Sequence, residues 1–271
     1  MGHMLEPAKM RLLDAARGAK PHAVFDAAGY ALHLEDNLIE GVSRNQFEAD
    51  YLAGAGQELG GKMRAAHSSA ALVVNAFAPW RERVSKFALA GVTDFSSLRF
   101  EAVYPTGLGG TPPHLDMVAD GATSVAVESK CLEYLTPKIA IFSRSYDTIT
   151  DSRCDSPWFG LIDLLRRDPS HYRYLDVAQL VKHALGLMNA SLSGEVILLY
   201  VYWEPVNDRQ FQECGQHRDE IADLQAMLRC AKPILRSSTY QQIWEGWAAQ
   251  RGEPWLKTHV DRLQERYTIA I

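Results

Sequence analysis

The sequence predicts an α/β fold in which a mixed central β-sheet is flanked by helices on both faces. Residues 114–130 contain two strand-like runs separated by Asp120-Gly121, a pair typical of the turn in a β-hairpin. Residues 174–188 repeat apolar side chains with the period of a helix. Residues 196–203 are almost uninterruptedly apolar, as expected of a strand inside a sheet that is covered on both sides.

The remaining elements follow from local patterns. Residues 54–61 are too rich in glycine for a stable helix, so Glu58 is expected on an irregular segment. Ser68-Ser69 is a candidate N-cap for a buried helix that ends near Pro79. Residues 97–104 alternate like a strand, and two or three helices packed through tryptophans complete the chain: Trp244, Trp247 and Trp255.

In the predicted strand 97–104, the two faces carry different residues. Leu98, Phe100 and Ala102 are expected on one face, and Arg99, Glu101 and Val103 on the other.

The composition limits domain number and location. With 271 residues, 47% of them hydrophobic, the chain can bury one large core, and we expect a single domain over residues 5–271. Residues 1–4 have the form of a tag remnant. No stretch approaches the roughly 18 consecutive apolar residues of a membrane span, and the four scattered cysteines suit reduced thiols, so a cytoplasmic protein is expected.

A net charge of −5 and a pI near 6.0 argue against a broad basic surface for nucleic acids. Any nucleic-acid chemistry must therefore depend on a local site, and the hairpin supplies one. Glu128 and Lys130 are two residues apart on one strand, so their side chains project from the same face.

Whether Asp116 joins that face depends on the hairpin turn. A two-residue loop pairs Asp116 with Val125 and places it on the face opposite to Glu128. A three-residue loop over residues 120–122 pairs Asp116 with Ala126 and brings the charged side chains together. We therefore expect an odd-length loop or a bulge, since a plain two-residue turn would leave Asp116 on the face opposite to Glu128 and Lys130.

Two carboxylates and a lysine are chemically suited to hydrolysis of a phosphodiester. The carboxylates offer hard oxygen ligands to Mg²⁺, which keeps several waters and takes further ligands from the substrate phosphate. The metal lowers the pKa of a bound water. A cation beside Lys130 would lower the pKa of this lysine, which could then orient or deprotonate the attacking water; we favour orientation and charge stabilisation.

Leu115-Asp116 followed by Glu128-Ser129-Lys130 resembles the PD-(D/E)xK signature of restriction-endonuclease-like nucleases. Leucine stands in the position of the proline that gives the signature its name, and Pro112-Pro113 lies just upstream. The resemblance spans a core of about residues 54–205, with a helical C-terminal part at about 216–266. Residues 67–75 are close to the Ser-Ser-x-Ala-Leu-x-x-Asn helix of a bacterial restriction-endonuclease-like subgroup.

The resemblance implies a role for each residue of the motif. Asp116, Glu128 and Lys130 would be catalytic, with Glu58 and Gln179 in support, and the metal ligands would be Asp116, Glu128 and Glu58. It implies Mg²⁺ or Mn²⁺ as the cofactor, DNA as the nucleic-acid partner, and a homodimer as one way to cut both strands.

Other polar residues near the motif have simpler alternatives. Glu58 could be a solvated loop carboxylate and Gln179 part of the polar face of a packed helix. Lys182 and His183 fit surface or phosphate-positioning roles. Glu101 could also be a metal ligand, but Glu58 is the preferred candidate.

Three other charged or titratable positions also have structural explanations. Glu133 could neutralise Lys130, and His114 fits a structural or phosphate-contact role. His217-Arg218 is expected on a helix surface.

The sequence thus predicts a metal-dependent endonuclease that acts on DNA, and it leaves two alternatives open. One is a binding protein that kept the nuclease fold without activity. The other is a metal-dependent hydrolase with a non-nucleic-acid substrate. A basic strip beside the Asp116-Glu128 cleft would favour the nuclease.

Overall fold

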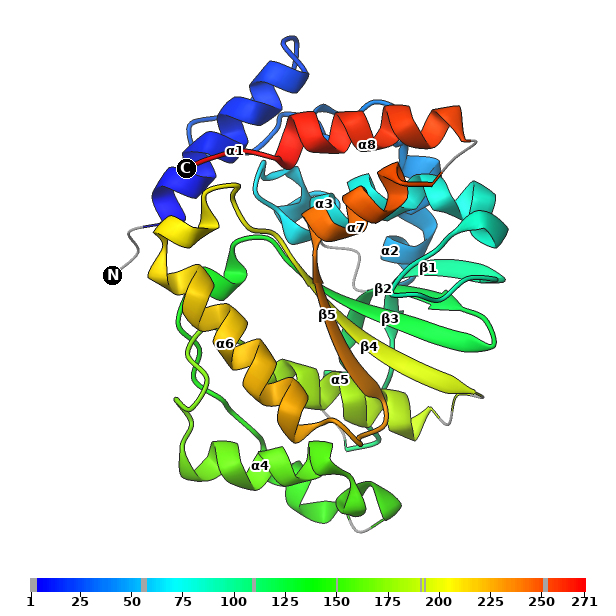
Figure 1. Ribbon diagram of the computed structural model, residues 1–271, viewed down its shortest axis with the longest axis vertical. Coiled ribbons are helices and arrows are strands. Elements are labelled where there is room, and N and C mark those ends of the chain that lie inside the picture. Colours follow the sequence, from blue (N-terminus) through cyan, green and yellow to red (C-terminus); the bar gives the residue numbers. More distant parts are fainter. Residues whose placement is uncertain are drawn as a thin grey trace.

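A five-stranded mixed sheet forms the centre of the protein (Figure 1). The computed structural model describes residues 4–54, 58–108, 111–149, 151–190, 192, 194–250 and 253–271. The strands lie side by side in chain order: β1 (Ser97–Val103), β2 (His114–Asp120), β3 (Thr123–Lys130), β4 (Glu195–Tyr202) and β5 (Ile234–Thr239). The first three pair antiparallel, and β4 and β5 continue the sheet in parallel with β3. The predicted α/β fold is confirmed, and β5 is a strand that the sequence patterns missed.

Helices cover both faces of this sheet, as the sequence predicts (Figure 1). On one face lie α1 (Leu5–Ala19), α3 (Ser69–Phe77), α7 (Tyr240–Ala248) and α8 (Pro254–Tyr267). On the other lie α4 (Pro157–Arg167), α5 (Val177–Asn189) and α6 (Gln212–Met227), while the short α2 (Glu48–Ala53) packs against β1. The helices α5 and α6 precede β4 and β5 in the chain, as parallel strand pairs require.

The strand β4 is buried on both sides, which explains its unbroken apolar sequence. Ile197, Leu199 and Val201 pack into the core beneath α3 and α7, while the residues between them pack beneath α5 and α6. Fully burying a large apolar side chain contributes roughly 1.5–3 kcal/mol, so this strand anchors both layers.

The predicted cap of α3 is confirmed, because the Ser68 hydroxyl accepts a hydrogen bond from the Ala71 amide at 3.2 Å. Asn75 in the same helix is fully buried: its side chain accepts from the Ile39 amide at 2.9 Å and donates to the Tyr267 hydroxyl at 2.8 Å. The helix therefore joins the N-terminal segment to α8.

The strand β1 does not keep a single alternation. Leu98 and Phe100 pack into the core beneath α3, as predicted, but Ala102 packs into the core beneath α5, so its predicted face is wrong. The change of face occurs at Glu101, whose φ of +48° lies in the left-handed region. A non-glycine residue held there costs on the order of 1–3 kcal/mol.

His217 corrects another prediction, because it is fully buried and does not lie on a helix surface. The helix α6 turns it toward the sheet, where its Nε2 lies 3.0 Å from the Tyr200 hydroxyl and its ring stacks on Tyr134. Arg218, the next residue, reaches outward and pairs with Glu204 at 2.8 Å. The pKa of His217 falls from 6.5 to about 3, because burial and then the charge of Arg218 disfavour the protonated ring.

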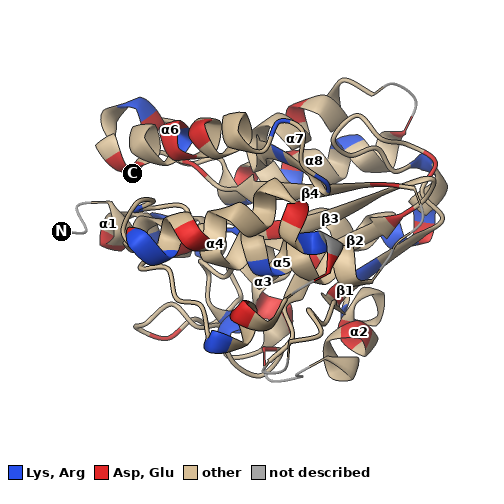
Figure 2. Ribbon diagram, turned by 90° about the horizontal axis from the view of Figure 1, so that it is seen from below, with Lys and Arg blue, Asp and Glu red and all other residues tan. Residues whose placement is uncertain are grey.

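Charged residues of both signs are interspersed over the ribbon in Figure 2, in keeping with the small net charge. No helix in the described ranges combines the length and the apolar composition needed to cross a membrane.

The burial of His217 predicts that the folded protein loses stability in acid. Above pH 6.5 His217 is neutral in both folded and unfolded chains, so the full stability is present. As the pH falls below 6.5, the unfolded chain takes up a proton that the folded chain refuses until about pH 3. The free energy of unfolding should then fall by roughly 1.4 kcal/mol per pH unit for this histidine. Urea unfolding of wild type and His217→Gln at pH 7.5 and 5.5 should show a smaller pH difference in the variant. His22→Gln, which changes an exposed histidine, should keep the wild-type difference, and equal differences in all three proteins would contradict the assignment.

Candidate active site

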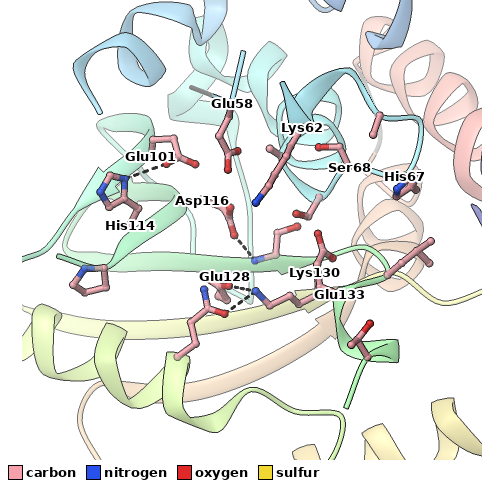
Figure 3. A pocket seen from close by; sticks show the side chains of 18 of the residues that line it. Glu58, Lys62, His67, Ser68, Glu101, His114, Asp116, Glu128, Lys130 and Glu133 are labelled. Carbon is pink, nitrogen blue, oxygen red and sulfur yellow. Dashed lines mark hydrogen bonds and ion pairs between the residues drawn. The ribbon is translucent and has the colours of Figure 1, made fainter. Parts of the chain in front are cut away.

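A cavity of about 770 Å³ opens where β2 and β3 meet α5 and the N-terminal half of the chain. Figure 3 shows the side chains that converge on it. The hairpin contributes Asp116, Glu128 and Lys130, while α5 contributes Gln179 and His183. The site thus joins residues that are far apart in the sequence.

The hairpin register places Asp116 beside Glu128. Met117 pairs with Val127, and Val118 pairs with Ala126, so the same register sets Asp116 opposite Glu128. The odd-length loop is confirmed, since Ala119 pairs with Val125 and an odd number of residues separates them. The predicted pairing of Asp116 with Ala126 is wrong by two positions.

Asp120 explains the shift. It remains in the sheet opposite Ser97, whose hydroxyl donates to its carboxylate at 3.1 Å, and Arg99 pairs with it at 2.9 Å. The turn therefore begins at Gly121. A Cβ at this glycine would lie 3.1 Å from the Asp94 carbonyl oxygen, so close approach of backbone is what favours glycine there.

Asp116 is held toward the neighbouring strand. Its Oδ2 accepts a hydrogen bond from the Ser129 amide at 2.7 Å. Burial raises the pKa of Asp116, the negative charge of Glu128 raises it further, and Lys130 offsets only part of the shift. An added cation between these two carboxylates would therefore be stabilising.

Glu128 is almost fully buried, with 2% of its surface exposed. One carboxylate oxygen pairs with the Lys130 ammonium, and the other lies 2.8 Å from Nε2 of His183. Burial alone would raise the pKa of Glu128, but Lys130 and then His183 outweigh burial and lower it. Within the described residues neither ring nitrogen of His183 makes a hydrogen bond of regular geometry.

Lys130 lies between Glu128 and Gln179. Its ammonium donates to Oε1 of Gln179 at 2.8 Å. Burial would lower the pKa of Lys130, but the carboxylates of Glu128 and Asp116 raise it above the ordinary value. The lowered pKa expected from the sequence requires a nearby cation and does not apply to these side chains alone.

His183 corrects the sequence interpretation, because it is buried at the site and does not lie on the surface. The signal was present in the spacing: His183 lies four residues after Gln179, so both project from one face of α5. Lys182 also borders the cavity, with its ammonium 5.7 Å from the centre of the Phe142 ring.

Glu58 and Glu101 add two more carboxylates to the cavity wall. In Figure 3 the Glu58 carboxylate points down toward Asp116, and Glu101 lies beside His114. The Nδ1 of His114 is 3.2 Å from Oε2 of Glu101. Burial, and then the charges of Glu58 and Glu128, raise the pKa of Glu101 to about 7.

Glu133 does not neutralise Lys130 in the described part of the chain. Its carboxylate accepts a hydrogen bond from the Cys131 amide at 2.7 Å, and Lys130 pairs with Glu128. This removes the main structural alternative for the lysine.

The donor set is compatible with Mg²⁺. Asp116 and Glu128 present hard oxygen ligands, and Mg²⁺ binds through one or two carboxylates while it keeps waters. Among the residues that the structure describes, no group of three or more His, Cys, Asp and Glu side chains is arranged so that it could hold a metal ion.

The mixed sheet with helices on both faces is consistent with a restriction-endonuclease-like core. A family model described as "Restriction Endonuclease associating with ARP" matches residues 2–268, and the chain belongs to this family. No curated protein and no solved structure matches the chain. The family indicates a nuclease-type function.

The two carboxylates should have opposite effects on stability when neutralised. Asp116→Asn removes a repelled charge and keeps an oxygen for the Ser129 amide, so it should raise the free energy of unfolding by roughly 1 kcal/mol without divalent metal. Glu128→Gln leaves the buried Lys130 charge without its counter-ion and should lower it by about 3 kcal/mol. Urea unfolding at pH 7.5 in EDTA measures both, with the exposed Asp163→Asn as a neutral control. Equal signs for the two variants would refute the charge balance.

Proposed function

We propose that this chain is a metal-dependent endonuclease of the PD-(D/E)xK type that hydrolyses phosphodiester bonds in DNA. The convergence of Asp116, Glu128 and Lys130 in one cavity carries the proposal, since it unites two metal-binding carboxylates with a cation. Membership in a restriction-endonuclease family supports it.

Asp116 and Glu128 would hold Mg²⁺ or Mn²⁺, and Glu58, which lines the same cavity, would add a ligand only after its side chain moves closer to them. When bound, the metal supplies a water of lowered pKa and offsets charge on the phosphate. The two carboxylates would hold the metal at the base of the cavity, where Glu128 is almost fully buried and low exposure strengthens electrostatic interactions.

Lys130 would orient the attacking water and stabilise negative charge on the phosphate. Its ammonium stays protonated beside Glu128 and Asp116, which favours electrostatic work over proton abstraction. Gln179 holds Lys130 through a 2.8 Å hydrogen bond, so Gln179 acts as a positioning residue. His183 does the same for Glu128 from the other side.

The description of the family also states an association with ARP. We include in the proposal that this chain associates with ARP as well. A homodimer stays a prediction.

Plasmid cleavage tests the function. Wild type should nick supercoiled DNA with Mg²⁺ or Mn²⁺ and not with EDTA, while Asp116→Ala and Lys130→Ala should lose about 100-fold or more in rate. Lys257→Ala, which changes a surface lysine that is 79% exposed, is the matched control and should cut like wild type. Wild type that is inert in every metal, or site variants that cut as fast as the control, would contradict the proposal and favour a binding protein.

Gln179 gives a separate prediction. Gln179→Met keeps the length of the side chain but removes the acceptor for Lys130, so kcat should fall about tenfold with KM little changed. Steady-state cleavage of a fluorescent oligonucleotide measures both constants. A rise in KM with kcat unchanged would instead show that Gln179 contacts the substrate.

A further inference from the structure

The active-site cavity extends beyond the carboxylates to a wall made by the N-terminal part of the chain. Leu5 and Lys9 of α1, Tyr30, Lys62 and His67 line this end. We call Lys9, Tyr30, Lys62 and His67 the N-terminal subsite. The proposed metal and lysine chemistry gives none of these residues a role, although they line the same cavity.

Backbone pairing holds Tyr30 in place. Tyr30 forms an antiparallel bridge with Ala65, and the neighbouring Ala31 amide donates to the Arg64 carbonyl at 2.8 Å. The Asp26 carboxylate accepts a hydrogen bond from the Tyr30 amide at 2.8 Å. The partner segment leads directly into the capped start of α3, so Tyr30 is attached to the same rigid wall as His67.

The subsite combines flat rings with free positive charge. Lys62 is exposed, and within the described chain it makes no ion pair. Figure 3 shows its ammonium pointing into the cavity between Glu58 and Asp116. Lys9 pairs with Glu6 at 2.7 Å, and burial together with Lys9 lowers the pKa of His67, which keeps this ring neutral at pH 7.

We propose that the N-terminal subsite binds the unpaired nucleotide next to the scissile phosphate, so that the strand is cleaved where it is single-stranded. Tyr30 and His67 stack on the base, and Lys62 contacts the phosphate that links it to the cleaved position. This inference rests on the proposed nuclease function, since it assigns the substrate class of the same site.

Size and depth favour an unpaired strand. A cavity of about 770 Å³ falls within the range of small-ligand sites, roughly 300–1,000 Å³, and Glu128 at its base is only 2% exposed. A base inside a duplex has both faces covered by its neighbours, so it cannot stack on Tyr30 unless it leaves the helix. Stacking of one base on an aromatic side chain contributes about 1–3 kcal/mol to binding of single strands.

Binding in Ca²⁺ tests the subsite without turnover. Fluorescence anisotropy should show that wild type binds a fluorescein-labelled eight-nucleotide single strand more tightly than a blunt duplex of the same sequence. Tyr30→Leu should weaken single-strand binding about 5- to 150-fold, while Tyr30→Phe keeps the ring and the affinity. Lys62→Met should reduce the slope of log K against log salt by about 0.7, the loss of one phosphate contact. Lys257→Met serves as the surface control.

The outcomes separate this inference from the nuclease proposal. Equal or tighter binding of the duplex, or a folded Tyr30→Leu protein with wild-type affinity for the single strand, overturns the subsite even if wild type nicks plasmid. Binding of the single strand that depends on Tyr30, in a protein that cuts neither DNA form with any metal, supports the subsite and overturns the nuclease. Urea unfolding of Tyr30→Leu confirms that the tested protein is folded.

Discussion

The charge balance around Glu128 is the interaction on which the candidate site depends. A carboxylate with 2% exposure would be costly to keep ionised, and Lys130 and His183 each contact one of its oxygens. Since Gln179 holds Lys130, the helix α5 supplies two of the contacts that keep this arrangement in place. Asp116 takes a smaller part in this balance: the Ser129 amide donates a hydrogen bond to it, Lys130 acts on it only through its charge, and among the described residues no cation forms an ion pair with it.

This asymmetry gives the two carboxylates different roles. The charge of Glu128 is offset mainly by Lys130. The pKa of Asp116 is raised, because the nearby positive charge does not compensate for burial and for the negative charge of Glu128. The pKa of Glu101 is also raised, to about 7, and its backbone is held at φ +48°. Strained backbone and crowded negative charge cost stability, and such costs are typical of functional sites.

The fold explains how a small net negative charge is compatible with the proposed nucleic-acid substrate. The cations that matter are local: Lys130 lies at the base of the cavity and Lys62 at its N-terminal wall. That wall depends on long-range pairing between residues 29–31 and 64–66 and on the anchoring of α3 to α8 through Asn75. The segments that shape the cavity are therefore held by the same core that supports the sheet.

Short-range patterns were enough to predict the α/β class, the hairpin and the cap of α3. They also predicted that Asp116, Glu128 and Lys130 would lie together, and the three side chains line one cavity, while their catalytic role stays a prediction. Periodicity and spacing act over a few residues, so the sequence displays them directly. Local patterns do not predict the strand β5, because residues Ile234–Thr239 form a short and mostly polar run. This run becomes a strand only through its pairing with β4.

The hairpin register and the buried positions of His183 and His217 could not be read in the same way. For His183, the four-residue spacing places it on the same helix face as Gln179, but it does not show that this face is buried. Each of these three features depends on a contact between segments distant in sequence: Asp120 with Ser97, α5 with β3, and α6 with β4. A histidine in a helix has the same local pattern whether it faces water or a carboxylate. Its environment is set by the element that packs against it, and that is a property of the folded chain.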